Sequence, residues 1–373
     1  MIEIPLLKDN HNHLFVYSAL NQAINIFDIS EKKEVINIIK TFNDNKINVI
    51  TGWLDNYYSF QDAELNNFAP LIIVHNSLHK YIFNLSAAKI IAEKYPEWVE
   101  NNNNQIWVEK NIMQILSYIS SLKAFDKAEL DNTIAKNKEN GFYFTSDMFV
   151  DNDDVFDFLN NNHEYMQITE IWTSPEKFKT LPEHHKKICK GVKIFTDGAL
   201  GASSAAISEY KGHWNSVLSY SQNELTQKLE EISELKTEIA IHCIGDIAIE
   251  QVINSLKIVQ KRNPIPKIRL EHCQFITEKQ AKNAKDLSLI LSMQPNFSMD
   301  SEIYSDRLTK NYCIKNNPFR MLIDNIGFVC GKDLIFGTDG MPTSAEIALK
   351  MSLFPPVSGQ KLKIEEFIAG YSD

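Results

Sequence analysis

Short apolar runs that end in polar residues or glycine alternate along the chain with amphipathic segments. The segments between the runs, such as Glu224–Leu235 and Ile247–Val259, repeat apolar residues at the spacing of one helix face. Eight runs read as strands: Leu6–Lys8, Phe142–Thr145, Tyr165–Ile168, Val192–Phe195, Ile239–Ile241, Ile268–Leu270, Leu287–Leu291 and Leu334–Phe336. Because strands that alternate with helices form parallel sheets, the pattern predicts an α/β protein.

Eight such strands joined by right-handed crossovers predict a closed (β/α)8 TIM-type barrel with its helices outside. The chain has 373 residues, which exceeds the roughly 250 residues of a typical barrel. The excess lies between the first two strands, where Ile47–Thr51 and Leu71–Val74 are also strand-like. We therefore expect residues 45–125 to form an inserted, lid-like subdomain at the catalytic face.

Composition limits the cellular compartment and the kinds of partner that we expect for the chain. A formal net charge of −10 argues against nucleic acid or an anionic membrane as the main partner. Five cysteines without a Cys-x-x-Cys pair fit a reducing compartment. The N-terminus has no basic start followed by an apolar stretch, and no run is long enough to span a bilayer. We expect a cytoplasmic protein that binds a small-molecule substrate; the sequence leaves open whether it forms a homo-oligomer.

His11 and His13 follow the first predicted strand at positions i and i+2. Such side chains point to the same side of a strand, about 7 Å apart, so both imidazoles can reach one cation. Two surface histidines in a terminal tail are the alternative. Lys193 lies in an apolar strand, where a buried lysine is costly, and alternation turns it into the barrel. An edge lysine that reaches water is the alternative here.

His242 and His272 end two successive predicted strands, and Asp339 follows the last one within Gly-Thr-Asp-Gly. A single strand-end histidine is more often structural, and an aspartate before glycine is a common turn signal. Six such residues on five predicted strands are harder to explain as separate structural or turn residues. In a parallel barrel the ends of all strands meet at one face, so the six side chains are predicted to converge there.

The sequence resembles the amidohydrolase superfamily, and within it the branch that includes N-substituted formamide deformylase. The resemblance is carried by Asp9–Leu14, Gly52-Trp53, Asn140–Met148, Val192–Ala206, Ile241–Ala248, Arg269–Gln274, Ser292–Pro295 and Phe336–Pro342. It implies one or two divalent metal ions, with zinc favoured by imidazole and carboxylate ligands. The implied ligands are His11, His13, Lys193, His242, His272 and Asp339. It further implies that Lys193 is carboxylated and that Asp339 is also the catalytic base.

Four more residues match the family less closely. His79, in the predicted insert, Asp197 and Gln294 are interpreted as substrate-binding residues. For His79 the alternative is an exposed loop histidine, and for Gln294 it is a structural hydrogen bond. Asp246 is interpreted as a partner that fixes a metal ligand, with a helix N-cap as the alternative.

The expected activity is hydrolysis of an amide or formamide-like carbon–nitrogen bond by a hydroxide generated at the metal. A deaminase of a cyclic amidine and a metal-binding barrel without turnover are the alternatives. Members of the family usually carry a small β-sandwich built from both chain ends. Because only 34 residues (373 minus 339) follow Asp339, we expect this sandwich to be absent.

Overall fold

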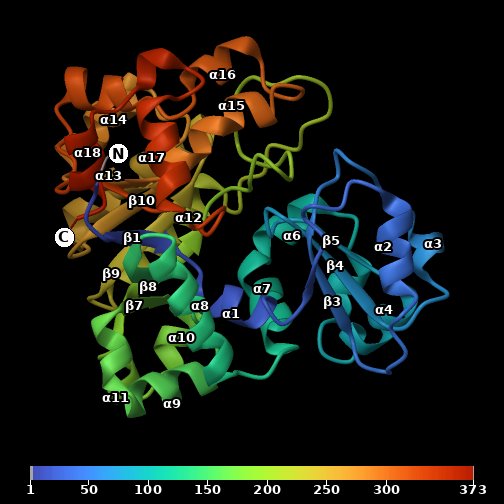
Figure 1. The fold of residues 1–373 in the computed structure, drawn as a ribbon. Helices are drawn as coiled ribbons and strands as arrows, with labels where there is room; N and C mark the ends of the chain where they lie inside the picture. Colours follow the sequence, from blue (N-terminus) through green and yellow to red (C-terminus); the bar gives the residue numbers. More distant parts are fainter. Residues whose placement is uncertain (1–2, 373) are drawn as a thin grey trace.

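Eight parallel strands form one sheet that is closed almost completely into a barrel (Figure 1). The computed structural model describes residues 3–372. The strands follow one another around the barrel in chain order: β1 (Leu7–Asn12), β6 (Phe142–Asp147), β7 (Thr169–Thr173), β8 (Cys189–Phe195), β9 (Glu238–Cys243), β10 (Ile268–His272), β11 (Ile290–Met293) and β12 (Leu334–Phe336). The predicted barrel is therefore confirmed.

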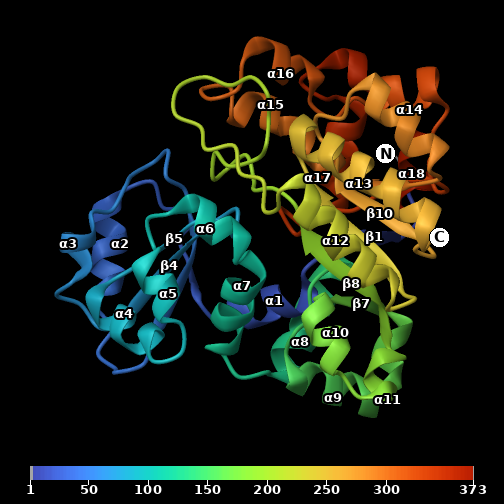
Figure 2. The same cartoon turned by 180° about the vertical axis from the view of Figure 1, so that it is seen from behind.

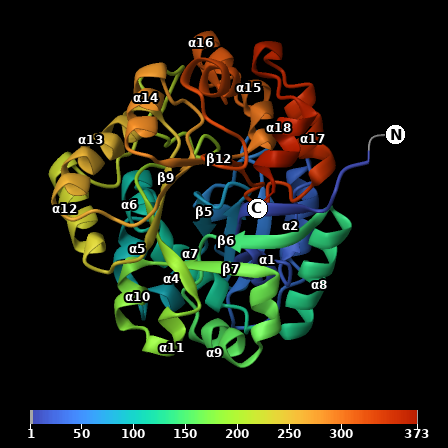
Figure 3. The ribbon, with the colours of Figure 1, turned by 90° about the vertical axis from the view of Figure 1, so that its left-hand side faces the viewer.

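Helices form an outer ring around these strands, as Figure 3 shows. From β6 onward they are α9 (Asp153–Asn161), α10 (Pro175–Thr180), α11 (Glu183–Lys186), α12 (Gln222–Ser233), α13 (Asp246–Arg262), α14 (Glu278–Asp286), α15 (Asp300–Ile303), α16 (Lys310–Lys315), α17 (Ala345–Leu353) and α18 (Ile364–Gly370). The 3-10 turns η1 (His163–Gln167), η2 (Pro295–Met299) and η4 (Ser358–Gln360) and the π-helix η3 (Met321–Ile326) complete the ring. None of the described helices is long and apolar enough to cross a bilayer.

Strand alternation divides each barrel strand between two environments. On β8 and β9, Val192, Ile194, Ile239 and Ile241 pack outward against the helix layer. Lys193 faces inward, where it lies in register with Ala240. Polar and charged side chains share the barrel interior with a small apolar cluster of Met148, Trp172 and Ala240. The largest apolar core lies between strands and helices.

One predicted strand was misplaced. Tyr165–Ile168 was expected to be a strand, but η1 covers His163–Gln167 and β7 begins at Thr169. Tyr165 packs among apolar residues outside the barrel, beside Phe156 and Leu159 of α9. An apolar run of four residues fits either kind of element, and here outward packing favours the turn.

The insert between β1 and β6 is a second body with its own sheet, joined to the barrel through α1 and α7 (Figures 1 and 2). Its elements are α1 (Leu14–Leu20), β2 (Ile24–Asn25), α2 (Lys32–Ile39), β3 (Asn48–Trp53), α3 (Asp62–Leu65), β4 (Leu71–His75), β5 (Tyr81–Phe83), α4 (Leu85–Ala92), α5 (Pro96–Glu100), α6 (Gln105–Lys110) and α7 (Ile112–Ser121); α8 (Lys127–Glu139) then leads back to the barrel. The sheet begins with β2, so it includes chain that precedes the expected range 45–125.

The insert sheet is apolar on both faces, which explains its continuous apolar runs. On β4, Leu71 and Ile73 pack with the helices α2 and α3, whereas Ile72 and Val74 pack with α4 to α7. The second of these clusters also includes Phe195 of the barrel strand β8. The insert therefore shares a packed core with the barrel, beside the end of β8.

Candidate metal centre

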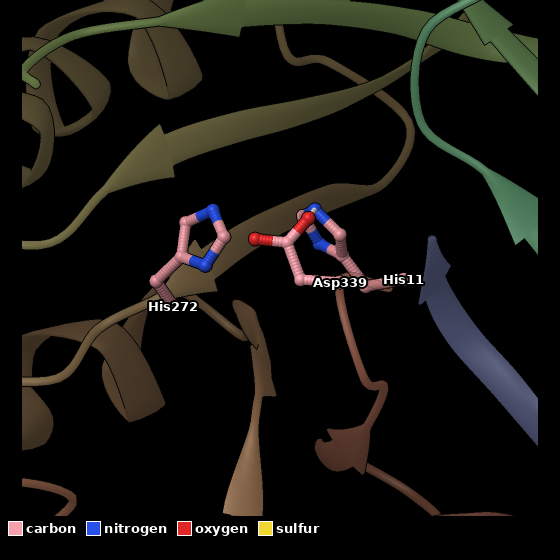
Figure 4. Close-up of side chains that lie close together, drawn as sticks. All are labelled: His11, His272 and Asp339. Carbon is pink, nitrogen blue, oxygen red and sulfur yellow. Dashed lines mark ion pairs between the residues drawn. The ribbon is translucent and has the colours of Figure 1, made fainter. Parts of the chain in front are cut away.

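Three buried side chains from different parts of the barrel meet at its carboxyl-terminal end. His11 lies near the end of β1, His272 is the last residue of β10, and Asp339 follows β12. One ligand atom from each lies within 4.8 Å of the others. Figure 4 shows the carboxylate of Asp339 overlapping the ring of His11, with one oxygen directed toward His272. Two histidines and a carboxylate at this spacing are a donor set that suits a divalent ion such as zinc.

His13 and Lys193 extend this group. His13 Nε2 lies 3.2 Å from Asp339 Oδ1, and His11 Nε2 lies 3.5 Å from the same oxygen. The Lys193 side chain is fully buried, and its Nζ makes no hydrogen bond with any residue in the range 3–372. A buried lysine without a hydrogen-bond partner is unusual, and it lies here among side chains that can bind a cation.

His242 joins the group from β9. Its ring centroid lies 4.5 Å from that of His272, which in turn lies 4.8 Å from that of His11. Its Nε2 lies 3.1 Å from the carbonyl oxygen of Gly198, in the loop after β8. All six side chains singled out in the sequence are thus buried at one end of the barrel; their roles as metal ligands stay predictions.

The buried histidines favour their neutral form. Burial, followed by nearby Lys193, holds the pKa of His11 well below its ordinary value. Burial also lowers the pKa of His242 and of His272, each with a neighbouring histidine as the next cause. Because a metal binds the neutral imidazole, these rings can serve as ligands without first losing a proton at neutral pH.

Asp339 favours its charged form, and burial shifts Lys193 toward its neutral form. Burial alone would raise the pKa of Asp339, but His11 and His13 outweigh it and hold the pKa below its ordinary value. Burial lowers the pKa of Lys193 to about 8, against the opposing effect of the carboxylates of Glu271 and Asp339. The site therefore combines a carboxylate with an amine that loses its proton easily.

Two oxygen acceptors fix the orientation of His11 and His272. His11 Nδ1 donates to Glu271 Oε2 at 2.6 Å, and His272 Nδ1 donates to Gln294 Oε1 at 2.8 Å. Each ring then presents Nε2 to the other ligands. Gln294 was interpreted as a substrate-binding residue; the structure places it behind a predicted ligand, and a substrate contact stays a prediction.

Glu271 and its partner Arg269 were missed in the sequence, although a signal was present. Arg269 Nε donates to Glu271 Oε1 at 2.9 Å, and both side chains are buried inside the barrel. In Ile-Arg-Leu-Glu-His, polar and apolar residues alternate, which turns Arg269 and Glu271 to the same side of β10. Two charged residues on the inner side of a barrel strand could have been recognised as part of the site.

Two of the predicted ligand positions have a strained backbone. The φ angles of His272, Cys273 and Asp339 are 71°, 49° and 59°, in the left-handed region that non-glycine residues seldom adopt. Such conformations persist only where the surrounding structure holds them, and they cluster at functional sites. The turns after β10 and β12 therefore direct the side chains of His272 and Asp339 at an energetic cost.

The predicted substrate-binding residue Asp197 is bonded mainly to backbone N–H groups of neighbouring segments. The Asp197 carboxylate accepts hydrogen bonds from the backbone N–H groups of Ile244, Gly245 and Ala206 at 2.9–3.0 Å, although Oδ1 also lies 3.5 Å from His242 Nε2. Burial raises the pKa of Asp197 to about 7. Its predicted contact with substrate has no support from these bonds and stays a prediction.

Asp246 is the first residue of helix α13. Its carboxylate accepts hydrogen bonds from Ser208 Oγ at 2.7 Å and from Tyr312 OH at 2.8 Å. These contacts tie the loop after β8 to α16. Neither contact is with a predicted ligand, so the role of Asp246 as a partner of a ligand stays a prediction.

His79 reaches the centre from the insert. Its side chain is buried, and its ring centroid lies 5.7 Å from that of His242. His79 Nδ1 donates to Glu109 Oε2 at 2.7 Å. Burial alone would lower the pKa of His79, but the carboxylate of Glu109 outweighs it and raises the pKa. Glu109 was missed in the sequence, where it is one glutamate in an ordinary amphipathic segment.

Comparison with known proteins identifies the family. The model of the amidohydrolase family matches residues 3–345, nearly the whole chain. The chain belongs to the amidohydrolase family. Its curated relatives include "Putative amidohydrolase YtcJ" of Bacillus subtilis, which is 31% identical over 143 residues, 37% of this chain. That match takes in only 27% of the Bacillus protein.

A second curated relative of this amidohydrolase is "Protein LONG AFTER FAR-RED 3" of Arabidopsis thaliana, 28% identical over 117 residues. These residues are 30% of this chain and 20% of the Arabidopsis protein. The chain thus aligns with less than a third of the length of either relative.

Two solved structures share the fold over 98% of this amidohydrolase chain. One is an uncharacterized metal-dependent hydrolase from Pyrococcus furiosus, with a TM-score of 0.69, 18% identity and 80% of that chain covered. The other is an uncharacterized metal-dependent hydrolase from Pyrococcus horikoshii OT3, with a TM-score of 0.67, 20% identity and 76% coverage. At these identities the likeness establishes the barrel with its insert.

The unpaired polar atoms and the donor types at the site of this amidohydrolase fit a bound metal ion. Three buried polar atoms at the site, His11 Nε2, His13 Nδ1 and Lys193 Nζ, have no hydrogen-bond partner among residues 3–372. Buried polar atoms nearly always have partners, and several that lack them in one place indicate a missing ligand. The donor types, imidazole nitrogen and carboxylate oxygen, fit a divalent cation.

Proposed function

We propose that this amidohydrolase is a metal-dependent hydrolase that cleaves the carbon–nitrogen bond of an amide or formamide-like substrate. The observation that carries the proposal is the buried cluster of His11, His272 and Asp339, whose ligand atoms lie within 4.8 Å of one another. Family membership supports the class of reaction. The resemblance to N-substituted formamide deformylase supports the narrower choice of an N-acyl or N-formyl amine.

Some side chains of the site would bind metal, and Asp339 would transfer a proton. His11, His13, His242 and His272 would hold one or two divalent ions, with zinc proposed from the donor types. A bound divalent ion would polarise a carbonyl group and lower the pKa of a water molecule toward neutrality. Lys193, whose pKa of about 8 leaves part of the amine neutral at physiological pH, is suited to carboxylation and would then offer two oxygens.

Asp339 is proposed as the general base. Its carboxylate is buried, and His11 and His13 hold its pKa below the ordinary value, so it is charged before reaction. It would take one proton from the attacking water as the new carbon–oxygen bond forms. It would then give this proton to the departing nitrogen as the carbon–nitrogen bond breaks, which restores the carboxylate.

The test combines metal analysis with a panel of substrates. The purified protein is assayed for bound metal by mass spectrometry and incubated with N-formyl amines, N-acyl amines and cyclic amidines. We expect bound divalent metal and hydrolysis of at least one N-formyl or N-acyl amine. Turnover of cyclic amidines alone would favour the deaminase, and bound metal without any turnover would favour a barrel that has lost catalysis.

Asp339→Asn tests the base directly. This variant keeps an oxygen ligand but cannot take up the proton, so kcat should fall about 10²–10⁴-fold while most of the metal stays bound. Asp286→Asn, at the exposed end of α14, is the matched control and should retain full activity. Equal activity of Asp339→Asn and the control would refute the assignment of the base.

A further inference from the structure

Glu109 in α6 is a buried carboxylate held by both the insert and the barrel. Its Oε2 accepts a hydrogen bond from His79 Nδ1 at 2.7 Å. Its Oε1 accepts hydrogen bonds from Ser204 Oγ at 2.5 Å and Gln105 Nε2 at 2.9 Å. Ser204 belongs to the barrel loop after β8, whereas Gln105 and His79 belong to the insert. Because a buried charge requires such partners, these bonds restrict Glu109 to one position.

His79 lies between this carboxylate and the metal centre. Its ring centroid lies 5.7 Å from that of His242 and 6.3 Å from that of Phe195, which also belongs to the barrel. Nδ1 is bonded to Glu109, and Nε2 makes no hydrogen bond with any residue from 3 to 372. The insert therefore brings a buried imidazole with one uncommitted nitrogen to the edge of the centre.

The same arrangement occurs at two of the predicted ligands. His11 and His272 each bond an oxygen acceptor through Nδ1, from Glu271 and Gln294 respectively, and keep Nε2 for the site. A histidine held in this way presents its second nitrogen in a fixed direction. His79 repeats this arrangement on the insert side of the centre. A purely structural link between the insert and the barrel would need only the bond between Glu109 and Ser204.

We infer that His79 Nε2 hydrogen-bonds a polar atom of the substrate next to the scissile bond, and that Glu109 is a positioning residue for His79. This inference rests on the proposed hydrolase function. The ligand is the acyl–nitrogen group itself, whose oxygen and nitrogen are its hydrogen-bonding atoms. The insert then supplies part of the binding site.

Glu109→Gln tests the positioning role because it keeps the size of the side chain but changes its hydrogen bonding. Three donors converge on the Glu109 carboxylate, and glutamine offers only one oxygen to them. If the new amide group donates to His79 Nδ1, the ring proton must move to Nε2. We expect kcat/KM for the N-acyl or N-formyl amine to fall about 10–100-fold, with metal content unchanged. Glu100→Gln, exposed at the end of α5, is the matched control.

A double-mutant cycle separates positioning from general stabilisation of the fold. If Glu109 acts through His79, the double variant Glu109→Gln/His79→Gln should lose no more activity than His79→Gln alone. Selective ¹⁵N labelling of the 10 histidines, with the His79 signal assigned from its variant, should show a changed tautomer in Glu109→Gln without any metal. Additive losses, or an unchanged His79 signal, would overturn the inference.

The outcomes also separate this inference from the proposed function. Absence of wild-type turnover on the whole panel counts against the hydrolase, and acetohydroxamate binding to Co²⁺-loaded protein then tests His79 alone. In this case we expect Glu109→Gln and His79→Gln each to weaken acetohydroxamate binding about 10-fold relative to Glu100→Gln. Equal affinity in all three variants would overturn the positioning role.

Discussion

Glu271 and Gln294 hold equivalent nitrogens of two neighbouring histidines but differ in charge. Glu271 is a buried carboxylate that also accepts a hydrogen bond from Arg269, whereas Gln294 is neutral. A charged acceptor would make His11 the more basic of the two predicted ligands, since a hydrogen bond to a carboxylate raises the electron density of the ring. The two histidines are therefore expected to differ in how strongly they bind a cation.

Glu271→Gln should weaken metal binding more than the same substitution at an exposed glutamate does. The variant keeps an oxygen for His11 Nδ1 but loses the charge, so metal affinity should fall about 10–100-fold. Competition with a chelator of known affinity measures the change. Glu139→Gln, at the exposed end of α8, is the control and should bind metal as the wild type does. Equal affinity in the two variants would contradict the role of Glu271.

Asp300 gives a prediction about pH at a position outside the ligand set. Its buried carboxyl accepts a hydrogen bond from Gln274 Nε2 at 2.9 Å, and burial raises its pKa from the ordinary 3.8 to about 7. Between pH 4 and 7 the unfolded chain loses this proton while the folded protein keeps it. The stability contributed by the neutral carboxyl is therefore lost as pH rises through this window.

Asp300→Asn should remove this pH dependence, because the amide accepts the same hydrogen bond without a charge. Relative to the wild type, its melting temperature should rise by a few degrees between pH 5 and pH 8. Thermal unfolding of both proteins at the two pH values, at equal metal content, measures this difference. A constant difference between variant and wild type at both pH values would contradict the buried charge.

Sequence reasoning placed single residues well where strand geometry decides their position. Alternation and the shared end of parallel strands bring His11, Lys193, His272 and Asp339 to one face without any knowledge of side-chain packing. The partners of these residues were harder to recognise. Whether Gln294 touches substrate or His272 depends on rotamers and on the register of neighbouring strands, which the pattern of polar and apolar residues does not contain.

At the level of elements, the contact between the first and last strands is where the barrel closes. The backbone N–H of Asp339 donates to the carbonyl of His11 at 2.7 Å. Thr338 donates to the Asp9 carboxylate through its backbone N–H at 2.8 Å and through Oγ1 at 2.5 Å. Because these bonds connect residues next to two predicted ligands, closure of the barrel and assembly of the site depend on the same contacts.

Gly337→Ala should disturb both the closure of the barrel and the assembly of the site. A Cβ at Gly337 would lie 2.4 Å from the backbone nitrogen of His11 and 2.6 Å from its Cβ, so β1 and the loop after β12 must separate. We expect a loss of about 1–3 kcal/mol in the free energy of unfolding, together with weaker metal binding. Gly359→Ala is the control, since a Cβ there meets nothing within 4 Å. Denaturant unfolding and metal titration of both variants test this prediction.

The bounds of a strand were predictable where its apolar run coincides with the strand and ends at a polar turn. The last strand was predicted as Leu334–Phe336 and has these bounds in β12. The third strand was predicted too early, because the apolar run Tyr165–Ile168 packs outside the barrel while β7 contains the polar residues Thr169 and Glu170. Glu170 accepts a hydrogen bond from Ser146 Oγ at 2.8 Å, a contact between strands that no local pattern reveals.

For the whole molecule, the metal centre predicts a strong link between metal content and stability. Without a bound ion, Lys193 Nζ and His11 Nε2 are buried and have no hydrogen-bond partner among the described residues, so the metal-free protein should be the less stable form. Zinc at 100 times its dissociation constant should add about 2.7 kcal/mol to the free energy of unfolding. Calorimetry with zinc, with magnesium and after chelation measures the effect. Equal melting temperatures in the three samples would contradict a metal site in the folded protein.

The chain order of the ligands has a consequence for synthesis of the protein on the ribosome. His11 is made before the other predicted ligands, whereas Asp339 follows β12, the last strand of the barrel. The nascent chain can present histidines early, yet the carboxylate that completes the cluster emerges only after every other strand. Stable capture of the proposed ion is therefore expected to be a late event, after the barrel has been translated.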